Sequence, residues 1–123
     1  MQTNQKIRQF DTGAKRDAAD TKPDYEGFLS PLVIESFGAY MHKHRKQADG
    51  NLRDSDNWQK GFGSEHQSVC VKSAWRHFFD IWKIHRGHKV LDSKDGHEVT
   101  LEEACCAAMF NVMAILHKHL EKK

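Results

Sequence analysis

The stretch "EHQSVCVKSAWRHFFDIWKIHRG", residues 65–87, decides the fold. Its apolar residues recur every three or four positions, which predicts an amphipathic helix over residues 65–86 that ends at Gly87. The main apolar row consists of Val71, Ala74, Trp75, Phe78, Ile81 and Trp82. Cys70, Phe79 and Ile84 widen this row on both flanks, so we expect other helices to cover this one on several sides.

Two further helices are predicted, one before and one after this stretch. The first spans residues 31–47, because Ser30 is a favourable N-cap and Pro31 suits the first helical position. Leu29 has the spacing to pack on Ile34 as a hydrophobic staple. The last spans residues 100–120, where Thr100 and Glu103 have the spacing of a capping box. No stretch indicates a strand, so the predicted fold is all-α.

The chain divides by composition into two parts. Residues 1–28 mix Asp, Lys, Gly, Thr and Pro without an apolar period and are expected to be extended or irregular. Residues 29–123 carry the helices and form the predicted all-α domain. Three helices alone cover such wide apolar faces poorly, so we expect a homo-oligomer that completes a four-helix-type core across subunits.

Composition limits the class of protein. A chain of 123 residues with 29% charged and 38% hydrophobic residues suits one globular domain. The net charge of +2 is small for a nucleic-acid-binding protein, and the basic cluster "HKHRKQ" is soon followed by acidic residues. No apolar run reaches the roughly 20 residues that span a bilayer, and the first ten residues lack an apolar signal-peptide core. We therefore expect a cytoplasmic protein.

The chain contains three cysteines. Cys105 and Cys106 are adjacent within a predicted helix, and Cys70 lies in another. This arrangement matches neither a disulfide framework nor a zinc knuckle. We expect three reduced thiols.

Polar residues inside apolar rows are the first functional candidates. Asn111 shares a row with Ala104, Ala108 and Ile115, so small side chains leave room beside its amide. It could equally bond a neighbouring helix and fix the helix register. A similar row in the first helix contains Glu35, Gly38, Ala39 and His42. That row could line a cleft or face solvent.

On the flank of residues 65–86 lie Arg76, His77 and Asp80. Arg76 and Asp80 are four residues apart and could form an ordinary surface ion pair. Taken together, however, the three helices predict a polar pocket between them. Its oxygen ligands suit Mg²⁺ or Mn²⁺ better than zinc. The candidate ligands are Glu35, Asp80, Glu103 and Asn111, although the capping box alone would explain Glu103.

Cations near the N-terminus are candidates for phosphate binding. Lys15, Arg16 and Lys22 lie close to Gly13 in "DTGAKRD" and "DTKPDY". Lysine, arginine and glycine backbone amides are the groups that bind a triphosphate. A solvated tail would show the same composition.

Five segments, in this order, resemble the phage-type dATP/dGTP diphosphohydrolases, a family similar to the MazG-like all-α nucleoside triphosphate pyrophosphohydrolases. The Asn-Trp-x-x-Gly loop, the Arg-His pair and the late Phe-Asn are the most specific parts. The segments lie within about residues 10–119 and read "TGAKRD", "KPDYEGFLSPLVIESFGAYMHKHR", "DNWQKG", "WRHFFDIWKIHRG" and "EEACCAAMFNVMAILH".

The resemblance implies a helical oligomer that binds a purine deoxynucleoside triphosphate with Mg²⁺ and releases pyrophosphate. A phage-encoded protein of this kind would act in the cytoplasm of a bacterial host. The implied catalytic residues are Asp80, His77 and Asn111, and the metal ligands are Glu35, Asp80 and Glu103. The implied substrate-binding residues are Lys15, Arg16, Lys22, Asn57, Trp58, Lys60 and Arg76. The sequence departs from the acidic spacings of that family, because Cys106 follows Glu103 at three residues where an acid is expected.

The loop "RDSDNWQKGFG", residues 53–63, fits base recognition. An exposed Trp58 would stack on a base while Asn57 reads its polar edge. Alternatively, Trp58 folds back over the helix ends. Two other functions stay open: sequestration of a nucleotide without turnover, and binding of single-stranded nucleic acid through "HKHRK", Arg53 and Trp58.

Overall fold

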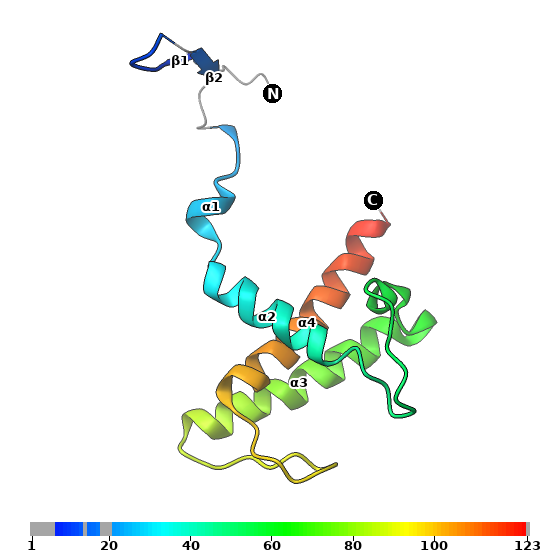
Figure 1. The fold of residues 1–123 in the computed structure, drawn as a ribbon. Coiled ribbons are helices and arrows are strands. Elements are labelled where there is room, and N and C mark those ends of the chain that lie inside the picture. Colours follow the sequence, from blue (N-terminus) through cyan, green and yellow to red (C-terminus); the bar gives the residue numbers. More distant parts are fainter. Residues whose placement is uncertain (1–6, 14, 18–20, 123) are drawn as a thin grey trace. The chain divides into compact units, whose positions relative to one another are not determined.

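The computed structural model describes residues 7–13, 15–17 and 21–122, with the backbone alone for residues 15–17. The chain divides into two compact units, Met1–Ile34 and Glu35–Lys123. The boundary falls inside helix α2 (Pro31–Lys43), six residues after the composition boundary at residue 28. Figure 1 shows the elements of both units in chain order.

The N-terminal unit contains more regular structure than its composition indicates. Strands β1 (Ile7–Gln9) and β2 (Lys15–Asp17) pair antiparallel, and Gly13 turns the chain between them with φ at +85°. Helix α1 (Tyr25–Phe28) is a single turn, capped by the Asp24 carboxylate, which accepts a hydrogen bond from the Gly27 amide at 2.9 Å. Among the described residues of this segment, regular structure is limited to these two three-residue strands and one helical turn, so the expectation of an extended or irregular segment is confirmed.

Helix α2 begins where the sequence predicts. The Ser30 hydroxyl accepts a hydrogen bond from the Val33 amide at 3.2 Å, which confirms the N-cap. The helix ends at Lys43 and not at residue 47, because the following residues turn back through a bridge between Lys46 and Leu52. Leu29 and Ile34 are both more than half exposed, so the predicted staple buries neither side chain.

Helices α3 (His66–His85) and α4 (Leu101–Glu121) pack against each other and form the core of the unit from Glu35 to Lys123 (Figure 1). Small side chains dominate the buried set, which lets the two helix backbones approach closely. The buried apolar residues are Cys70, Val90, Ala104, Cys106, Ala107 and Ala114. All three cysteines are free thiols, as expected.

The ends of α3 and α4 confirm their sequence signals. Gly87 has φ at +87°, and the His88 amide donates to the Lys83 carbonyl while the Gly87 amide donates to that of Ile84. These two bonds are a Schellman motif, which requires the left-handed conformation that glycine adopts without strain. Thr100 caps α4 by accepting the Glu103 amide at 3.1 Å. The fold is all-α, as predicted.

One face of α3 is apolar and is not covered by other parts of the same chain. Trp75, Phe78, Phe79 and Trp82 have exposed fractions of 70%, 58%, 50% and 55%. Their spacing places them on one side of the helix. The face of α3 that packs on α4 is therefore only one of the two apolar faces that the sequence pattern indicates.

In the described ranges, no helix combines the length and the apolar character needed to cross a membrane.

Candidate functional site

The loop that carries Trp58 folds onto α4. Residues Asn57–Lys60 form the 3₁₀ helix η2, and the Trp58 ring meets the His117 ring edge to face, with centroids 4.8 Å apart. Trp58 is half-buried, so the expectation of an exposed indole is wrong, and the alternative of a ring folded back on a helix is confirmed. Phe62, by contrast, is 53% exposed.

Gly61 lets this loop approach the helices closely. It has φ at +72°, and a Cβ atom there would lie 2.8 Å from Lys118 Cε and 2.9 Å from His66 Nδ1. Only a residue without a side chain fits both the backbone conformation and the space. The Gly in "NWQKG" thus has a packing role against α3 and α4.

His66 is a buried histidine that the sequence pattern does not single out. Its Nδ1 accepts a hydrogen bond from the Phe62 amide at 3.1 Å, and its Nε2–H donates to the Ala114 carbonyl at 3.0 Å. These partners fix the neutral tautomer with the proton on Nε2. The imidazole therefore ties the loop, α3 and α4 together.

His77 marks a polar region on the flank of α3. The side chain is half-buried, and this burial lowers the pKa of its imidazole below 6.5. The carboxylates of Asp80 and Glu103 oppose this shift, while Arg76 adds to it. Asp80 and Glu103, from two helices that pack together, therefore both act electrostatically on His77.

Glu103 has a partner that the capping-box interpretation does not include. Its carboxylate accepts hydrogen bonds from His97 Nε2, at 2.9 Å and 3.1 Å from its two oxygens. The other ring nitrogen of His97 lies 2.5 Å from Asp95 Oδ1. The Glu103 and Asp95 carboxylates raise the pKa of His97. The side chain of Glu103 is thus part of a histidine and carboxylate cluster.

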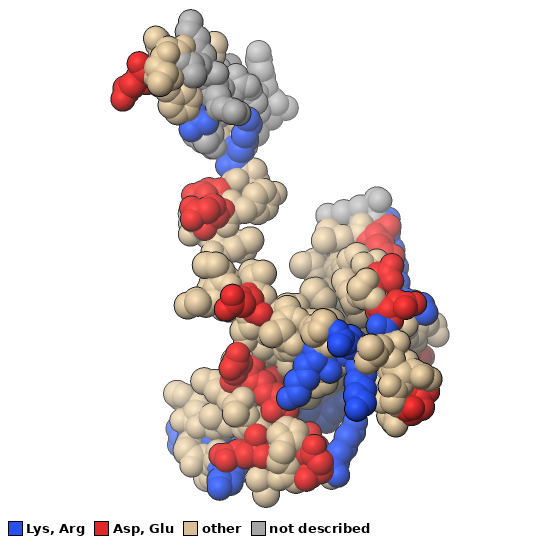
Figure 2. Space-filling model, in the orientation of Figure 1, with Lys and Arg blue, Asp and Glu red and all other residues tan. Residues whose placement is uncertain are grey.

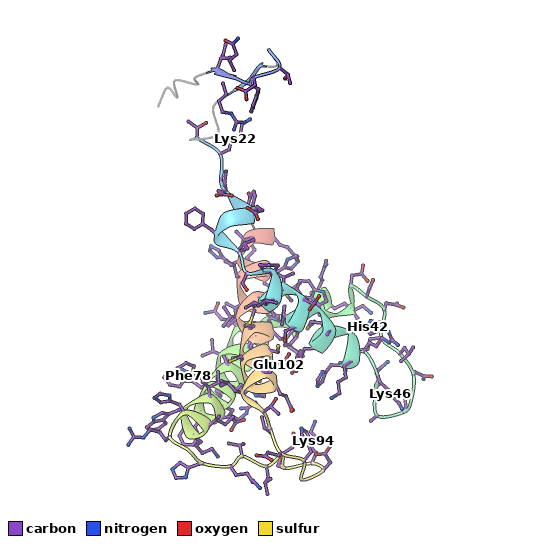
Figure 3. The ribbon with its side chains drawn as sticks, turned by 60° about the vertical axis from the view of Figure 1, so that its left-hand side comes forward. Lys22, His42, Lys46, Phe78, Lys94 and Glu102 are labelled. Atoms are coloured by element: carbon purple, nitrogen blue, oxygen red, sulfur yellow. The ribbon has the colours of Figure 1, made fainter. Side chains whose placement is uncertain are left out.

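Helix α2 adds polar groups next to the start of α4. The Ser36 hydroxyl donates to Glu102 Oε1 at 2.5 Å, and its oxygen lies 3.7 Å from the Cys106 sulfur. Burial, followed by the charges of Glu103 and Cys106, raises the pKa of Tyr40. The Tyr40 phenol therefore stays neutral beside these acidic groups. Figure 3 labels Glu102 in the first turn of α4.

The predicted metal ligands do not gather into one site. Among the described residues, the one group of three histidine, cysteine or acidic side chains with ligand atoms within 4.8 Å of one another is Asp92, His97 and Glu103. Glu35 and Asp80 are not part of it. Glu35 and its neighbours Gly38, Ala39 and His42 are all exposed, so in this chain that row faces solvent.

Asn111 is buried, but its amide serves its own helix. Its Nδ2–H donates to the Ala107 carbonyl at 2.9 Å, four residues earlier in α4. The structure thus places Asn111 in the core, with its amide nitrogen bonded neither to a neighbouring helix nor to the cluster around Glu103.

The remaining candidates lie on both units. Lys15, Arg16 and Lys22 belong to the N-terminal unit; the side chains of Lys15 and Arg16 fall outside the described part, and Lys22 is exposed. Asn57 is half-buried on η2, whereas Lys60 and Arg76 are exposed. The ion pairs of the described residues do not join Arg76 to Asp80, so the surface pair that their spacing allows is not formed here.

The surface of the unit from Glu35 to Lys123 carries both signs of charge. On the face shown in Figure 2, basic side chains gather near the middle of this unit and acidic side chains lie around them. Arg53 in the predicted nucleic-acid-binding set uses its guanidinium to donate to the His44 carbonyl at 3.3 Å. This face is therefore mixed in charge, with the basic group bordered by carboxylates.

Comparison of the chain with family models, with curated proteins and with solved structures gives no match.

Proposed function

We propose that the protein hydrolyses a purine (deoxy)nucleoside triphosphate to the monophosphate and pyrophosphate. The observation that supports this most is the half-buried His77 on α3, on which the carboxylates of Asp80 and Glu103 act from two packed helices. A neutral imidazole beside acidic groups is suited to accept a proton from water. Together with the motifs that resemble the pyrophosphohydrolases, it favours hydrolysis over other chemistry.

His77 is the proposed general base. Its lowered pKa keeps the ring unprotonated at neutral pH, so it accepts a proton from a water molecule as the water oxygen bonds to the α-phosphorus. The bond from that phosphorus to the bridging oxygen breaks, and pyrophosphate leaves. The exposed guanidinium of Arg76, next to His77, is available to the negative charge of the phosphates.

Mg²⁺ is the proposed cofactor, with Mn²⁺ as a substitute. The three predicted metal ligands, Glu35, Asp80 and Glu103, do not form one group of neighbouring side chains among the described residues of one chain. Mg²⁺ in nucleotide enzymes is commonly held by one or two carboxylates together with substrate phosphates. Asp80 is the carboxylate we assign to this role, and the ion would neutralise phosphate charge. Both triphosphates and Mg²⁺ are cytoplasmic, so we propose the same compartment for the protein.

A second copy of the chain is the proposed partner of α3. Trp75, Phe78, Phe79 and Trp82 expose a contiguous aromatic face. Exposed apolar patches of this kind mark association surfaces. A self-complementary helix face would complete a four-helix-type core from α3 and α4 of two chains.

The test of hydrolysis is to incubate the protein with each purine and pyrimidine dNTP and Mg²⁺ and to separate the products. We expect monophosphate and pyrophosphate from dATP or dGTP. Asp80→Asn is expected to lower kcat by about 100-fold or more. Asp56→Asn is the control, because the Asp56 side chain makes no capping bond to η2. Release of orthophosphate, or equal activity in both variants, would contradict the proposal.

Sequestration without turnover is the second candidate. The observation that favours it is the dispersal of the predicted acidic ligands, since Glu35 lies outside the only histidine and carboxylate group of the described residues. Nucleotide binding that persists in EDTA, with no product formed, would select this function over hydrolysis.

A further inference from the structure

A loop that precedes α4 brings metal-binding side chains to the start of that helix. The chain reverses between Val90 and Val99, whose amide donates to the Val90 carbonyl at 2.9 Å. Leu91 and Glu98 form a bridge, and the Asp92 amide donates to the His97 carbonyl at 2.8 Å. Val90 is only 5% exposed and anchors the loop. Asp92 and His97 are thereby held opposite each other, and Figure 3 labels Lys94 in the turn between them.

The three side chains present ligand atoms at distances that suit one ion. His97 Nε2 lies 2.9 Å and 3.1 Å from the two Glu103 oxygens. Ligands at right angles around an ion with bonds of about 2.1 Å lie roughly 3.0 Å apart. All three ligand atoms of Asp92, His97 and Glu103 fall within 4.8 Å of one another, compared with about 4.2 Å for ligands on opposite sides of such an ion. Binding one ion would therefore bring the ligand atoms within about 4.2 Å of one another, and the ion would replace the proton that His97 Nε2 donates to Glu103.

The remaining bonds orient these groups as ligands. Asp92 Oδ1 accepts the Lys94 amide at 2.8 Å, whereas no hydrogen bond in the described part of the chain uses Asp92 Oδ2. Asp95 Oδ1 lies 2.5 Å from His97 Nδ1 and also accepts the His97 amide at 3.0 Å. A carboxylate on the far nitrogen of a histidine fixes the ring and directs Nε2 to a metal. This partner is independent of the three ligand atoms.

We propose that Asp92, His97 and Glu103 bind one divalent first-row transition ion, with Asp95 as the positioning residue for His97. One imidazole with two carboxylates suits Mn²⁺, Fe²⁺ or Zn²⁺, whereas Mg²⁺ takes oxygen ligands. The site differs from the proposed Mg²⁺ role of Asp80 and does not depend on nucleotide hydrolysis. Glu103 is a ligand in this site, and its carboxylate also acts electrostatically on His77. An ion bound here would therefore change the electrostatic environment of His77.

The test titrates the full chain, stripped of metal and free of nucleotide, with MnCl₂ and follows free Mn²⁺ by electron paramagnetic resonance. We expect one Mn²⁺ per chain, and tenfold or greater weakening in both His97→Gln and Asp95→Asn. Asp95 and His97 are exposed, so neither change disturbs the core. Glu98→Gln, which removes a neighbouring exposed charge, is expected to leave the affinity unchanged.

Three outcomes would overturn the site. They are the absence of Mn²⁺ binding up to about 1 mM, the weak end of protein cation sites, an unchanged affinity in His97→Gln, and displacement of Mn²⁺ by an equal concentration of Mg²⁺. Mn²⁺ binding with the expected losses, in a protein that hydrolyses no nucleotide, would keep this site and reject the proposed hydrolysis.

Discussion

Glu103 shows how one residue satisfies two constraints. Its backbone amide donates to the Thr100 hydroxyl, which completes half of the predicted capping box. Its carboxylate does not need to complete the other half, because His97 offers a charge-assisted hydrogen bond. Sequence spacing predicts the hydrogen bond between the Glu103 amide and Thr100, because that bond is local. It does not reveal that His97, in the loop six residues earlier, lies next to the same turn of α4.

Gly61 and Gly63 provide a matched pair of substitutions. Both have positive φ, at +72° and +66°, but only at Gly61 would a Cβ atom meet neighbours, namely Lys118 and His66. Both alanine variants therefore share the backbone strain, and Gly61→Ala adds an overpacking cost of about 1 to 3 kcal/mol. Urea unfolding measures the difference. Equal losses in the two variants would mean that the loop moves away from the helices at no cost.

His77 predicts a pH dependence of stability. Burial lowers its folded-state pKa below 6.5, so the unfolded chain binds a proton more readily than the folded chain. The neutral form of His77 therefore contributes stability above pH 6.5. This contribution is lost as the pH falls through the folded-state pKa of His77. The urea midpoint of the wild type is therefore expected to fall more steeply below pH 6.5 than that of His77→Gln. Parallel pH profiles would show that His77 is not buried in solution.

The site residues are predictable from sequence only in part. His77, Asp80 and Glu103 stand out because polar residues interrupt apolar helical rows, and the structure couples them electrostatically. His97 does not stand out because its role depends on a loop conformation, although Asp95-Gly96 is a recognised hairpin signal. His66 lies at a predicted helix start, where a buried histidine has no distinctive neighbours in sequence.

At the scale of elements, the three long helices follow their local signals. Ser30, Thr100 and Gly87 act within one turn of their own positions, so sequence suffices to place these helix ends. The end of α2 depends instead on the bridge between Lys46 and Leu52, whose pairing the helical period does not encode. Helix α1 and the strands escape the sequence pattern because three or four residues are too short to show a period.

Gly38 and Gly87 give opposite predictions for the same substitution. Gly38 lies inside α2, and a Cβ atom added there would meet no atom within 4 Å, so Gly38→Ala should stabilise the fold by about 0.5 to 1 kcal/mol through helix propensity. Gly87 has equal space but φ at +87°, so Gly87→Ala should destabilise it by about 1 to 2 kcal/mol. Thermal melts followed by circular dichroism compare the two. A change of the same sign in both would contradict the assigned backbone conformations.

At the scale of the molecule, α3 presents one apolar face to α4 and another to the surroundings. The sequence predicts this, because its apolar residues occupy both flanks of the helix. The apolar period of α3 does not indicate which surface covers its second apolar face. The aromatic face is therefore the feature that connects the fold to the proposed assembly.

Phe78→Glu tests this assembly. Phe78 is 58% exposed at the middle of the aromatic face, so a carboxylate there would be desolvated by a second chain but hydrated in a monomer. We expect light scattering after size exclusion to show the wild type as an oligomer and the variant as a single chain of 14.2 kDa. Gln47→Glu adds the same charge on an exposed turn and should leave the mass unchanged. A monomeric wild type would reject the oligomer.

The two hydrogen bonds of His66 also determine how the protein opens. Because one imidazole holds the Phe62 amide and the Ala114 carbonyl, the loop cannot detach without leaving His66 Nδ1 as an unpaired acceptor between α3 and α4. Local fluctuation of the loop and separation of the helix pair therefore become a single cooperative event. The Phe62 amide proton should exchange with solvent on the timescale of the helix core, as part of the same folding unit, and far more slowly than the amides of an ordinary surface connection.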